Sequence, residues 1–297
     1  MKAYVIGATG HLGTELVRRI EELGIPVFKT YASTVLQGGT KFDLSQDDPV
    51  LVFGDLQPDD AVFILGAISN PDAVVTNPIK AMSVNVNGTI SLIDFINSRG
   101  SRIVFLSSVE VFDGKKEAYA EADTPNPLNL YGLTKWRVEQ YLRQFCSEGN
   151  FTIVRVCWNI GPTVASRCVV RLTFESLLSG NCRMAKDNFF NVISTQDTIR
   201  LLLKLINLNP LPTEIIHCAA DEVIVRSALA QRIFVKSIHS SKMSFEECQF
   251  DQLKFLEPRA RNNILNNALS KRLLGMDYQN AWDVIDAKIA AIDLSKQ

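Results

Sequence analysis

The chain has 297 residues, of which 46% are hydrophobic and 21% charged, which is an ordinary balance for a globular protein of one large or two moderate domains. Its 31 Lys and Arg residues face 32 Asp and Glu, so the net charge is -1. This balance excludes a global electrostatic field that would attract nucleic acid or an anionic membrane, and an anionic ligand must be held by local groups.

Neither a membrane span nor a metal site is expected. The first apolar run stops at Gly7, too early for the core of a signal peptide, and no apolar run approaches the ~20 residues that cross a bilayer. The six cysteines show no CxxC pair and no metal-ligand spacing, and the three histidines are scattered. We expect a reduced, cytoplasmic protein without a metal ion and without nucleic acid or membrane as a partner.

Short apolar runs alternate with helical patterns through the first half of the chain. The predicted strands cover residues 3–6, 26–31, 59–66, 101–108 and 151–158. The predicted helices between them cover about 11–23, 49–56, 77–98 and 129–142. Strands separated by helices form right-handed crossovers and a parallel sheet that is covered on both faces. The predicted fold class is therefore α/β, a doubly wound parallel sheet of the Rossmann type, with its ligand beyond the carboxyl ends of the strands.

Beyond residue 158 this alternation loosens. Helical patterns cover 166–180, 195–208 and 227–235, and one more apolar run at 214–219 predicts a strand. We predict a first domain over residues 1–160 and a smaller, interleaved C-terminal domain over 161–297. About residues 191–220 of the second part are expected to pack back on the first.

A glycine-rich loop follows the first predicted strand. In "YVIGATGHLG" the three glycines stand between a strand and a helix, where they permit a tight turn and a close approach of the backbone to a pyrophosphate. The spacing GxxGxxG differs by one residue from the dinucleotide fingerprint GxGxxG. The loop predicts dinucleotide binding by Gly7, Gly10, His11, Leu12 and Gly13.

The end of the second strand bears on the choice of cofactor. The stretch "FKTYAST" contains Lys29 and several hydroxyl groups but no carboxylate that would repel a 2′-phosphate. NADP(H) is therefore favoured, with NAD(H) left open. In "FDLS", Asp43 and Leu44 are placed to contact the adenine, although a helix cap at Asp43 or Ser45 fits the pattern equally well.

A serine pair, a tyrosine and a lysine suit the reduction of a carbonyl group. Ser107 and Ser108 end a strand at the ligand edge of the sheet, and Tyr131 and Lys135 lie one turn apart on a predicted helix. A serine hydroxyl can hold the substrate oxygen while the tyrosine donates a proton. A nearby ammonium group is expected to lower the pKa of the tyrosine, and it can also hydrogen-bond the nicotinamide ribose.

These motifs resemble those of the extended short-chain dehydrogenase/reductases. The set in chain order is GxxGxxG, "NVNGT" (85–89), "SSVEVF" (107–112), "YGLTK" (131–135) and "VRVCWNIGP" (154–162). The block "VFDGKKEAYAEADTPNPLNLYGLTK" (111–135) is similar to the dTDP-4-dehydrorhamnose reductases, as are segments at 191–206 and 257–275. The likeness is strong over about the first 160 residues and looser afterwards. It implies an NAD(P)-binding domain followed by a substrate-binding domain.

The resemblance assigns further residues to the site. It makes Ser108 the catalytic serine, with Ser107 structural, and places Gly66 and Ala67 near the nicotinamide ribose. Asn85 would support the cofactor side, although a buried helix hydrogen bond explains it as well. Trp158 and Asn159 would contact the sugar, with core packing as an equal alternative for Trp158. The cations available for a substrate diphosphate are Arg167, Arg171, Lys186, Arg259 and Arg261, each of which is otherwise a surface charge.

The resemblance implies reduction of a 4-keto sugar on a nucleoside diphosphate, and it leaves a homodimer open. Val109 and Glu110 follow Ser108, where the reductases usually have an aspartate–tyrosine pair and the sugar-nucleotide dehydratases an Asp–Glu pair. Val109 cannot act as an acid, which disfavours dehydration. Two alternatives remain. One is a sugar-nucleotide epimerase, and the other is a non-catalytic NADP-binding regulator, because the regulatory subunit of methionine adenosyltransferase resembles the same reductases.

Overall fold

A seven-stranded parallel sheet forms the centre of the computed structural model, which describes residues 1–164, 166–180 and 182–296. Its order is β3-β2-β1-β4-β5-β6-β11. The strands are β1 (Ala3–Ile6), β2 (Val27–Tyr31), β3 (Thr40–Lys41), β4 (Ala61–Ile64), β5 (Arg102–Ser108), β6 (Phe151–Val156) and β11 (Ile215–Cys218). The strand order reverses between β1 and β4, which opens a crevice at their carboxyl ends. The prediction of a doubly wound α/β sheet is confirmed.

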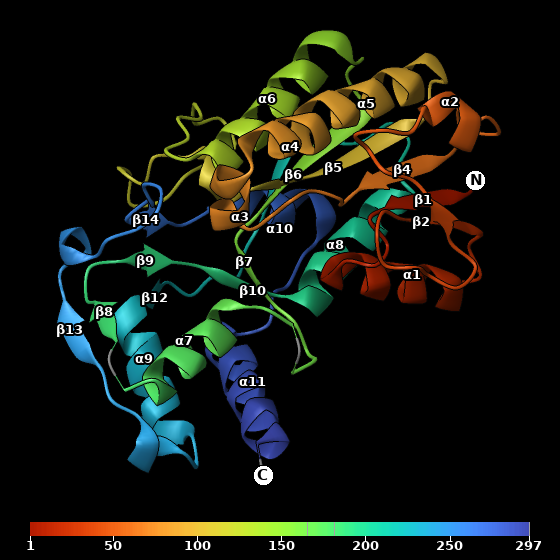
Figure 1. The fold of residues 1–297 in the computed structure, drawn as a ribbon. Coiled ribbons are helices and arrows are strands. Elements are labelled where there is room, and N and C mark those ends of the chain that lie inside the picture. Colours follow the sequence, from red (N-terminus) through yellow and green to blue (C-terminus); the bar gives the residue numbers. More distant parts are fainter. Residues whose placement is uncertain (165, 181, 297) are drawn as a thin grey trace.

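Helices cover both faces of this sheet (Figure 1). Helices α1 (His11–Glu22) and α8 (Thr195–Ile206) lie on one face, and α2 (Pro49–Val52), α4 (Pro78–Met82), α5 (Thr89–Ser98) and α6 (Leu130–Phe145) lie on the other. A short helix, α3 (Pro71–Thr76), follows β4. Successive side chains of β1 point to opposite faces of the sheet. Val5 packs in the core on the α1 side, and Tyr4 packs in the core on the α5 side. Covering both faces explains why these strands read as continuous apolar runs.

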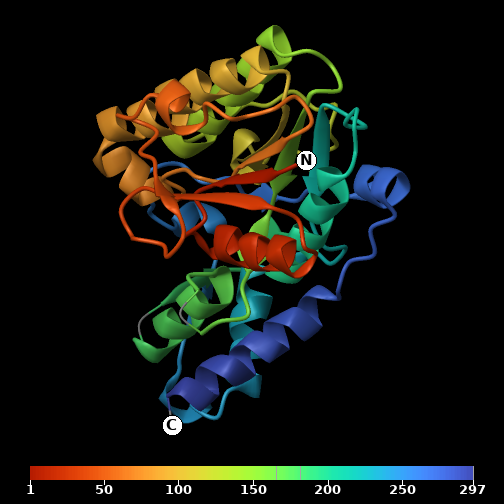
Figure 2. The same cartoon turned by 90° about the vertical axis from the view of Figure 1, so that its right-hand side faces the viewer.

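Most of the remaining chain builds a second group of elements, whose lower part lies below the α1 layer (Figures 1 and 2). Its strands are β7 (Trp158–Ile160), β8 (Arg183–Ala185), β9 (Phe189–Phe190), β10 (Val192–Ser194), β12 (Ile224–Val225), β13 (Glu246–Cys248) and β14 (Asn262–Asn263). They form the pairs β7–β10 and β8–β13 and the small sheet β12-β9-β14. Its helices are α7 (Val169–Leu178), α9 (Arg226–Lys236) and α11 (Ala281–Ser295), with short 3-10 turns at Ser240–Lys242 and Phe250–Gln252. Helix α10 (Ala268–Leu274) lies apart from them and packs against β11 of the large sheet (Figure 1).

Some predicted boundaries differ from the structure. The strand predicted over 151–158 ends at Val156, and Trp158 begins β7, which leaves the large sheet to pair with β10. The helix predicted over 49–56 stops at Val52. The helix predicted over 77–98 is continuous, although Ser83–Gly88 adopt a π-helical turn between α4 and α5. Residues 191–220 supply β10, α8 and β11, of which β11 is the edge strand of the large sheet.

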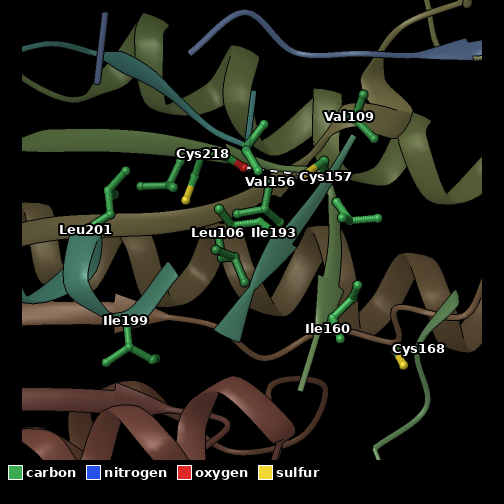
Figure 3. Close-up of a cluster of buried hydrophobic side chains, with 14 of the residues drawn as sticks. Leu106, Val109, Val156, Cys157, Ile160, Cys168, Ile193, Ile199, Leu201 and Cys218 are labelled. Atoms are coloured by element: carbon green, nitrogen blue, oxygen red, sulfur yellow. Dashed lines mark hydrogen bonds between the residues drawn. The ribbon is translucent and has the colours of Figure 1, made fainter. Parts of the chain in front are cut away.

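The core on the α8 side joins β5, β6 and β11 to the second group of elements. Figure 3 shows Leu106, Val156, Ile193, Leu201 and Cys218 in this cluster, all of them buried. The six cysteines are free thiols, and most of them are buried as small apolar side chains. In the described part of the chain, no helix combines the length and the apolar character needed to cross a bilayer.

Candidate active site

The glycine loop forms the tight turn between β1 and α1 that a dinucleotide needs. Gly7 has a positive φ of 85°, and a Cβ there would lie 2.8 Å from the Cα of Gly66. A Cβ on Gly13 would overlap the carbonyl of Gly7. Gly10 is the N-cap of α1 and offers no side-chain cap, and the first turn carries no acidic residue, so the first N–H groups of the helix are open to a phosphate. The residues present therefore fit a dinucleotide.

Side chains around this loop hold it in place. Thr30 on β2 accepts a hydrogen bond from the backbone N–H of Gly7 at 3.3 Å, a contact that the sequence analysis missed. The His11 ring lies 2.6 Å from the Thr195 hydroxyl, and burial lowers the pKa of His11, with help from nearby Lys288. Leu12 is half-buried against the core. His11 and Leu12 therefore anchor the loop through their side chains and leave their backbone for a ligand.

The residues predicted to contact the adenosine half are already engaged within the protein. Lys29 donates to Glu21 of α1 at 3.0 Å, so its ammonium group is paired. The Asp43 carboxylate accepts from the N–H and the hydroxyl of Ser45 at 2.9 and 2.7 Å, and these bonds lower its pKa. Asp43 thus holds the turn at residues 44–46 rather than a helix, because α2 begins at Pro49 and is capped by Asp48, which accepts from the N–H of Val50 at 2.9 Å. The backbone of Leu44 touches Gly88, where a Cβ would overlap the Leu44 carbonyl.

Asn85 fastens the loop that follows β4. Its side chain accepts from the N–H of Ile68 at 2.8 Å and donates to the Ile68 carbonyl at 3.0 Å. Its amide also lies 3.3 Å from the hydroxyl of Thr134 on α6. Asn85 stands on the π-helical turn, a local distortion that is frequent at functional sites. It thereby fixes Gly66 and Ala67, which are half-buried beside the glycine loop, relative to the helix that carries Tyr131.

Ser108, Tyr131 and Lys135 meet where β5 ends. Ser108 is the last residue of β5 and caps the short 3-10 turn Val109–Val111, and the other two residues lie one turn apart on the buried face of α6. Lys135 donates to the Leu106 carbonyl at 2.8 Å. Burial lowers the pKa of Lys135 to about 8, against the opposing charge of Glu139. This arrangement can hold a carbonyl oxygen and deliver a proton to it.

The expected lowering of the Tyr131 pKa is wrong for the protein as described. Burial raises this pKa above its ordinary value, because a phenolate is poorly solvated there. The adjacent Ser108 hydroxyl opposes the shift, and the charge of Glu110 adds to it. Tyr131 therefore carries its proton at neutral pH.

A buried carboxyl group lies beside this site. Glu110 accepts from the side chain of Asn129 at 2.7 Å, and burial raises its pKa, while Asn129 and Arg259 oppose the shift. Asn129 also caps α6, because its side-chain oxygen accepts from the N–H of Gly132 at 2.8 Å. The neighbouring Val109 is buried in the apolar core. The Asn129–Glu110 pair thus fixes the start of the helix that presents Tyr131.

Beneath the site lies an ion pair that the sequence analysis missed. Arg155 on β6 donates to Glu139 at 2.6 Å, and both side chains are at most 1% exposed. Ser107 also donates to Glu139, while the Arg155 guanidinium contacts the ring nitrogen of His217 at 3.5 Å. Ser107 is therefore structural. Two signals could have revealed the pair, namely an arginine inside an apolar strand and a glutamate one helical turn after Lys135.

The predicted sugar contacts lie on β7. Asn159 accepts from the hydroxyl of Thr198 at 2.8 Å, and this bond ties β7 to α8. Trp158 is half-buried, with one side against the core and the guanidinium of Arg226 5.8 Å from its ring. Ser108 is in register with Val156 at the end of the β5–β6 pairing, and Trp158 follows Val156 by two residues, so the chain enters β7 from the edge where Ser108 lies.

The cations predicted for a diphosphate are spread over several places. Arg259 pairs with Asp72 of α3 at 2.6 Å, and Arg261 pairs with Asp187 at 3.6 Å. The other three predicted cations are the half-exposed Arg171, which binds Glu175, and the exposed Arg167 and Lys186.

Arg259 lies in the segment that crosses to the site. In this segment, Glu257 accepts from the N–H of Leu130 at 3.1 Å, and the Pro258 carbonyl lies 3.5 Å from the amide of Asn129. The second group of elements is thereby tied to the start of α6.

The doubly wound sheet, the glycine turn and the ordered serine, tyrosine and lysine define an extended short-chain dehydrogenase/reductase fold. The chain belongs to the family described as RmlD substrate binding domain, which matches residues 1–290. The dTDP-4-keto-6-deoxy-D-glucose reductase of Streptomyces niveus is 31% identical over 160 residues, covering 53% of this chain and 52% of that protein.

Two further proteins are similar to this chain, one over a short segment and one over nearly its whole length. Methionine adenosyltransferase 2 subunit beta of Danio rerio is 39% identical over 66 residues, which cover 22% of this chain and only 20% of that protein. The crystal structure of a hypothetical dTDP-4-dehydrorhamnose reductase from Sulfolobus tokodaii has a TM-score of 0.80 and 27% identity, covering 96% of this chain and 99% of that one. The chain therefore shares its whole fold with the reductase structure and a short segment with the transferase subunit.

Proposed function

We propose that this protein reduces a 4-keto sugar carried on a nucleoside diphosphate, with NADPH as the hydride donor and Tyr131 as the proton donor. The proposal rests on the meeting of Ser108, Tyr131 and Lys135 beyond β5, at the edge where the glycine turn leaves a helix N-terminus open. The family match over residues 1–290 and the 31% identity to the Streptomyces niveus reductase support it.

Each side chain has a distinct task in this reaction. NADPH supplies the hydride when it is bound along the glycine turn. Ser108 holds the keto oxygen with its hydroxyl, and Tyr131 donates its proton to that oxygen as negative charge develops. Because burial raises the pKa of Tyr131, the phenol is fully protonated and available at neutral pH. Lys135, with a pKa lowered to about 8, carries a positive charge that stabilises the phenolate left behind and holds the nicotinamide ribose.

NADPH is proposed over NADH because residues 32–34, which follow β2, contain no carboxylate to repel a 2′-phosphate. Lys29 contributes little to this preference, since Glu21 already holds its ammonium group. We expect NADH to be accepted as well, with a modest difference in affinity. Titrating the protein with both cofactors by nicotinamide fluorescence measures this difference.

The test is consumption of NADPH in the presence of a panel of 4-keto sugars on dTDP and UDP. Tyr131→Phe removes the hydroxyl and is expected to reduce turnover at least ~100-fold, which is the usual contribution of a placed acid. Tyr141→Phe is the matched control, because Tyr141 lies on the same helix and binds Asp94 away from the site. If the wild-type protein consumes no NADPH with any sugar, or if Tyr131→Phe is as active as wild type, the proposal fails.

Two other functions are distinguished by the same assay. An epimerase of the same fold would interconvert sugar nucleotides without net loss of NADPH. The second alternative is a non-catalytic regulator. Its support is the 39% identity to methionine adenosyltransferase 2 subunit beta over a short match of 66 residues. Such a regulator would bind NADPH, leave every sugar unchanged and co-purify with a partner enzyme. The complete Ser108, Tyr131 and Lys135 set favours the reductase.

A further inference from the structure

Arg226 is a guanidinium group that the catalytic scheme does not use. It is the first residue of α9, and its Nε lies 3.5 Å from the side-chain oxygen of Asn188. Its guanidinium lies 4.7 Å from the centre of the Phe190 ring and 5.8 Å from that of Trp158. Within residues 1–164, 166–180 and 182–296, no carboxylate pairs with Arg226. Arg259 and Arg261, by contrast, each have an aspartate.

The surroundings of Arg226 favour an anion from outside the protein. Burial lowers the pKa of Arg226 to about 10, so the group is still charged at neutral pH but is poorly solvated. The residue is partly buried but still reaches solvent, and its two terminal nitrogens have no hydrogen-bond acceptor in the described part of the chain. Contacts with two rings and with Asn188 restrict the position of the guanidinium before any ligand arrives. A planar, fixed fork of donors binds a phosphate through two parallel hydrogen bonds.

A second unsatisfied polar group lies on the small sheet beside Arg226. The side-chain oxygen of Asn263 is buried and has no hydrogen-bond partner in the described structure. Asn263 on β14 is in register with Phe190 on β9, so the two side chains lie on the same face of the small sheet. Phe190 is the ring that packs against Arg226. The face thus combines a cation that can bind a phosphate with an acceptor that can take a hydrogen bond from a hydroxyl or N–H of the same ligand.

This face lies next to the candidate active site. The segment leading into β14 touches the site through Glu257 at Leu130, and Tyr119 donates its N–H to the Ile264 carbonyl at 2.9 Å. Trp158 connects the candidate active site with the face that carries Arg226. It follows β6 at the edge where Ser108 lies, and its ring lies 5.8 Å from the Arg226 guanidinium. A ligand whose sugar reaches Ser108 would extend along Trp158 toward Arg226.

We propose that Arg226, held beside the rings of Trp158 and Phe190, binds the diphosphate of the substrate, and that it sets the preference for a sugar carried on a nucleoside diphosphate. This assignment rests on the proposed function, which supplies the anion. It also moves the principal diphosphate contact away from the five cations that the sequence indicated. Arg259, of those five, is held by Asp72.

The experiment measures nucleotide binding rather than turnover. Isothermal titration of the full chain with UDP and dTDP, each compared with its nucleoside, gives the contribution of the diphosphate. Arg226→Gln is expected to weaken nucleoside diphosphates about 10- to 100-fold, the usual value of a charge-assisted bidentate contact, and to leave the nucleosides unchanged. Arg226→Lys keeps the charge but loses the planar fork, so an intermediate loss is expected. Arg183→Gln, an exposed arginine on β8, is the control.

The outcomes separate this inference from the proposed function. If the wild-type protein binds NADPH but neither UDP nor dTDP, the proposed substrate class fails and Arg226 loses its ligand. If the wild-type protein binds them and Arg226→Gln binds them equally well, the Arg226 assignment is overturned while the reductase proposal stands. NADPH affinity of each variant reports whether the fold is intact. Should Arg226→Gln fail to fold, Arg226→Lys decides alone: wild-type affinity for UDP and dTDP overturns the assignment, and a loss specific to the diphosphates supports it.

Discussion

Replacing Glu139 by glutamine would remove the charge from the ion pair beneath the site and leave the shape of the side chain nearly unchanged. Arg155 binds Glu139 through two nitrogens, Nη2 at 2.6 Å and Nε at 3.1 Å, and neither side chain is more than 1% exposed. Without the carboxylate, the guanidinium is left buried and uncompensated. Breaking one partner of such a pair costs about 3–5 kcal/mol.

That loss is measurable by thermal or urea unfolding. For a chain of this size, each kcal/mol lowers the melting temperature by about 2–4 °C, so Glu139→Gln is expected to lower it by roughly 6–20 °C. Glu214→Gln is the matched control, because Glu214 pairs with Arg143 at 3.1 Å on the surface, where a pair contributes under about 1 kcal/mol. The double variant Glu139→Gln with Arg155→Met removes the stranded charge and is expected to recover much of the loss.

A second readout ties this pair to the chemistry. The Glu139 carboxylate supports the Lys135 ammonium, which burial destabilises. Its removal should lower the pKa of Lys135 below about 8 and shift the upper limit of the pH–rate profile to lower pH. If Glu139→Gln is as stable as Glu214→Gln and keeps the wild-type pH profile, the reasoning from the buried charge is refuted.

Three further predictions follow from the same site. Turnover of the wild-type protein should fall as pH rises through about 8, because Lys135 then loses its proton, and a rate that is flat across a pH series spanning this value would contradict that role. Gly13→Ala should weaken NADPH binding in a fluorescence titration, since the added methyl overlaps the Gly7 carbonyl and overpacking costs about 1–3 kcal/mol; unchanged affinity would mean that the turn adjusts freely. Asn85→Ala should lower the free energy of unfolding in urea by about 1–3 kcal/mol, because both backbone groups of Ile68 lose their partner, and a loss under ~0.5 kcal/mol would show that water replaces the amide.

The first half of the fold was predictable because each strand is an uninterrupted apolar run with helical patterns on either side. The first predicted strand, 3–6, matches β1 residue for residue, since parallel strands buried on both faces tolerate few polar residues. The short strands of the second group, such as β9 and β14, were not predicted. They are two residues long and are defined by partners more than 70 residues away. No local pattern of two residues can specify such a pairing.

Helix α11 was not predicted either, although its sequence carries both an apolar period and a cap. Ala281, Ile285, Ile289 and Ile292 are buried at helical spacing, and Asn280 caps the helix by accepting from the N–H of Trp282 at 2.9 Å. The helix follows a region without alternating strands and helices, so its apolar period has no neighbouring strand pattern to support it.

The location of the site could be predicted from the order of strands and helices along the chain, whereas the pKa shifts of its residues could not. Ser108 ends a strand and Tyr131 begins a helix, so the topology alone predicts that they share the carboxyl edge. The pKa of Tyr131 depends on burial by elements from elsewhere in the chain, and no local sequence pattern measures that burial. For the same reason the sequence did not separate Arg226, which has no acid beside it, from Arg259, which has one.

One buried face of α6 joins the chemistry to the stability of the protein. Tyr131, Lys135, Glu139 and Leu142 follow one another at steps of four, four and three residues, so each lies about one turn below the last. A shift of this helix by one residue would rotate the whole stripe by about 100° and withdraw the phenol, the ammonium and the carboxylate together. The Asn129 cap at one end and the Arg155 contact at Glu139 both resist such a shift. Activity alone therefore cannot distinguish a chemical from a positional defect at Glu139, and the pH profile has to be measured on the same sample as the unfolding curve.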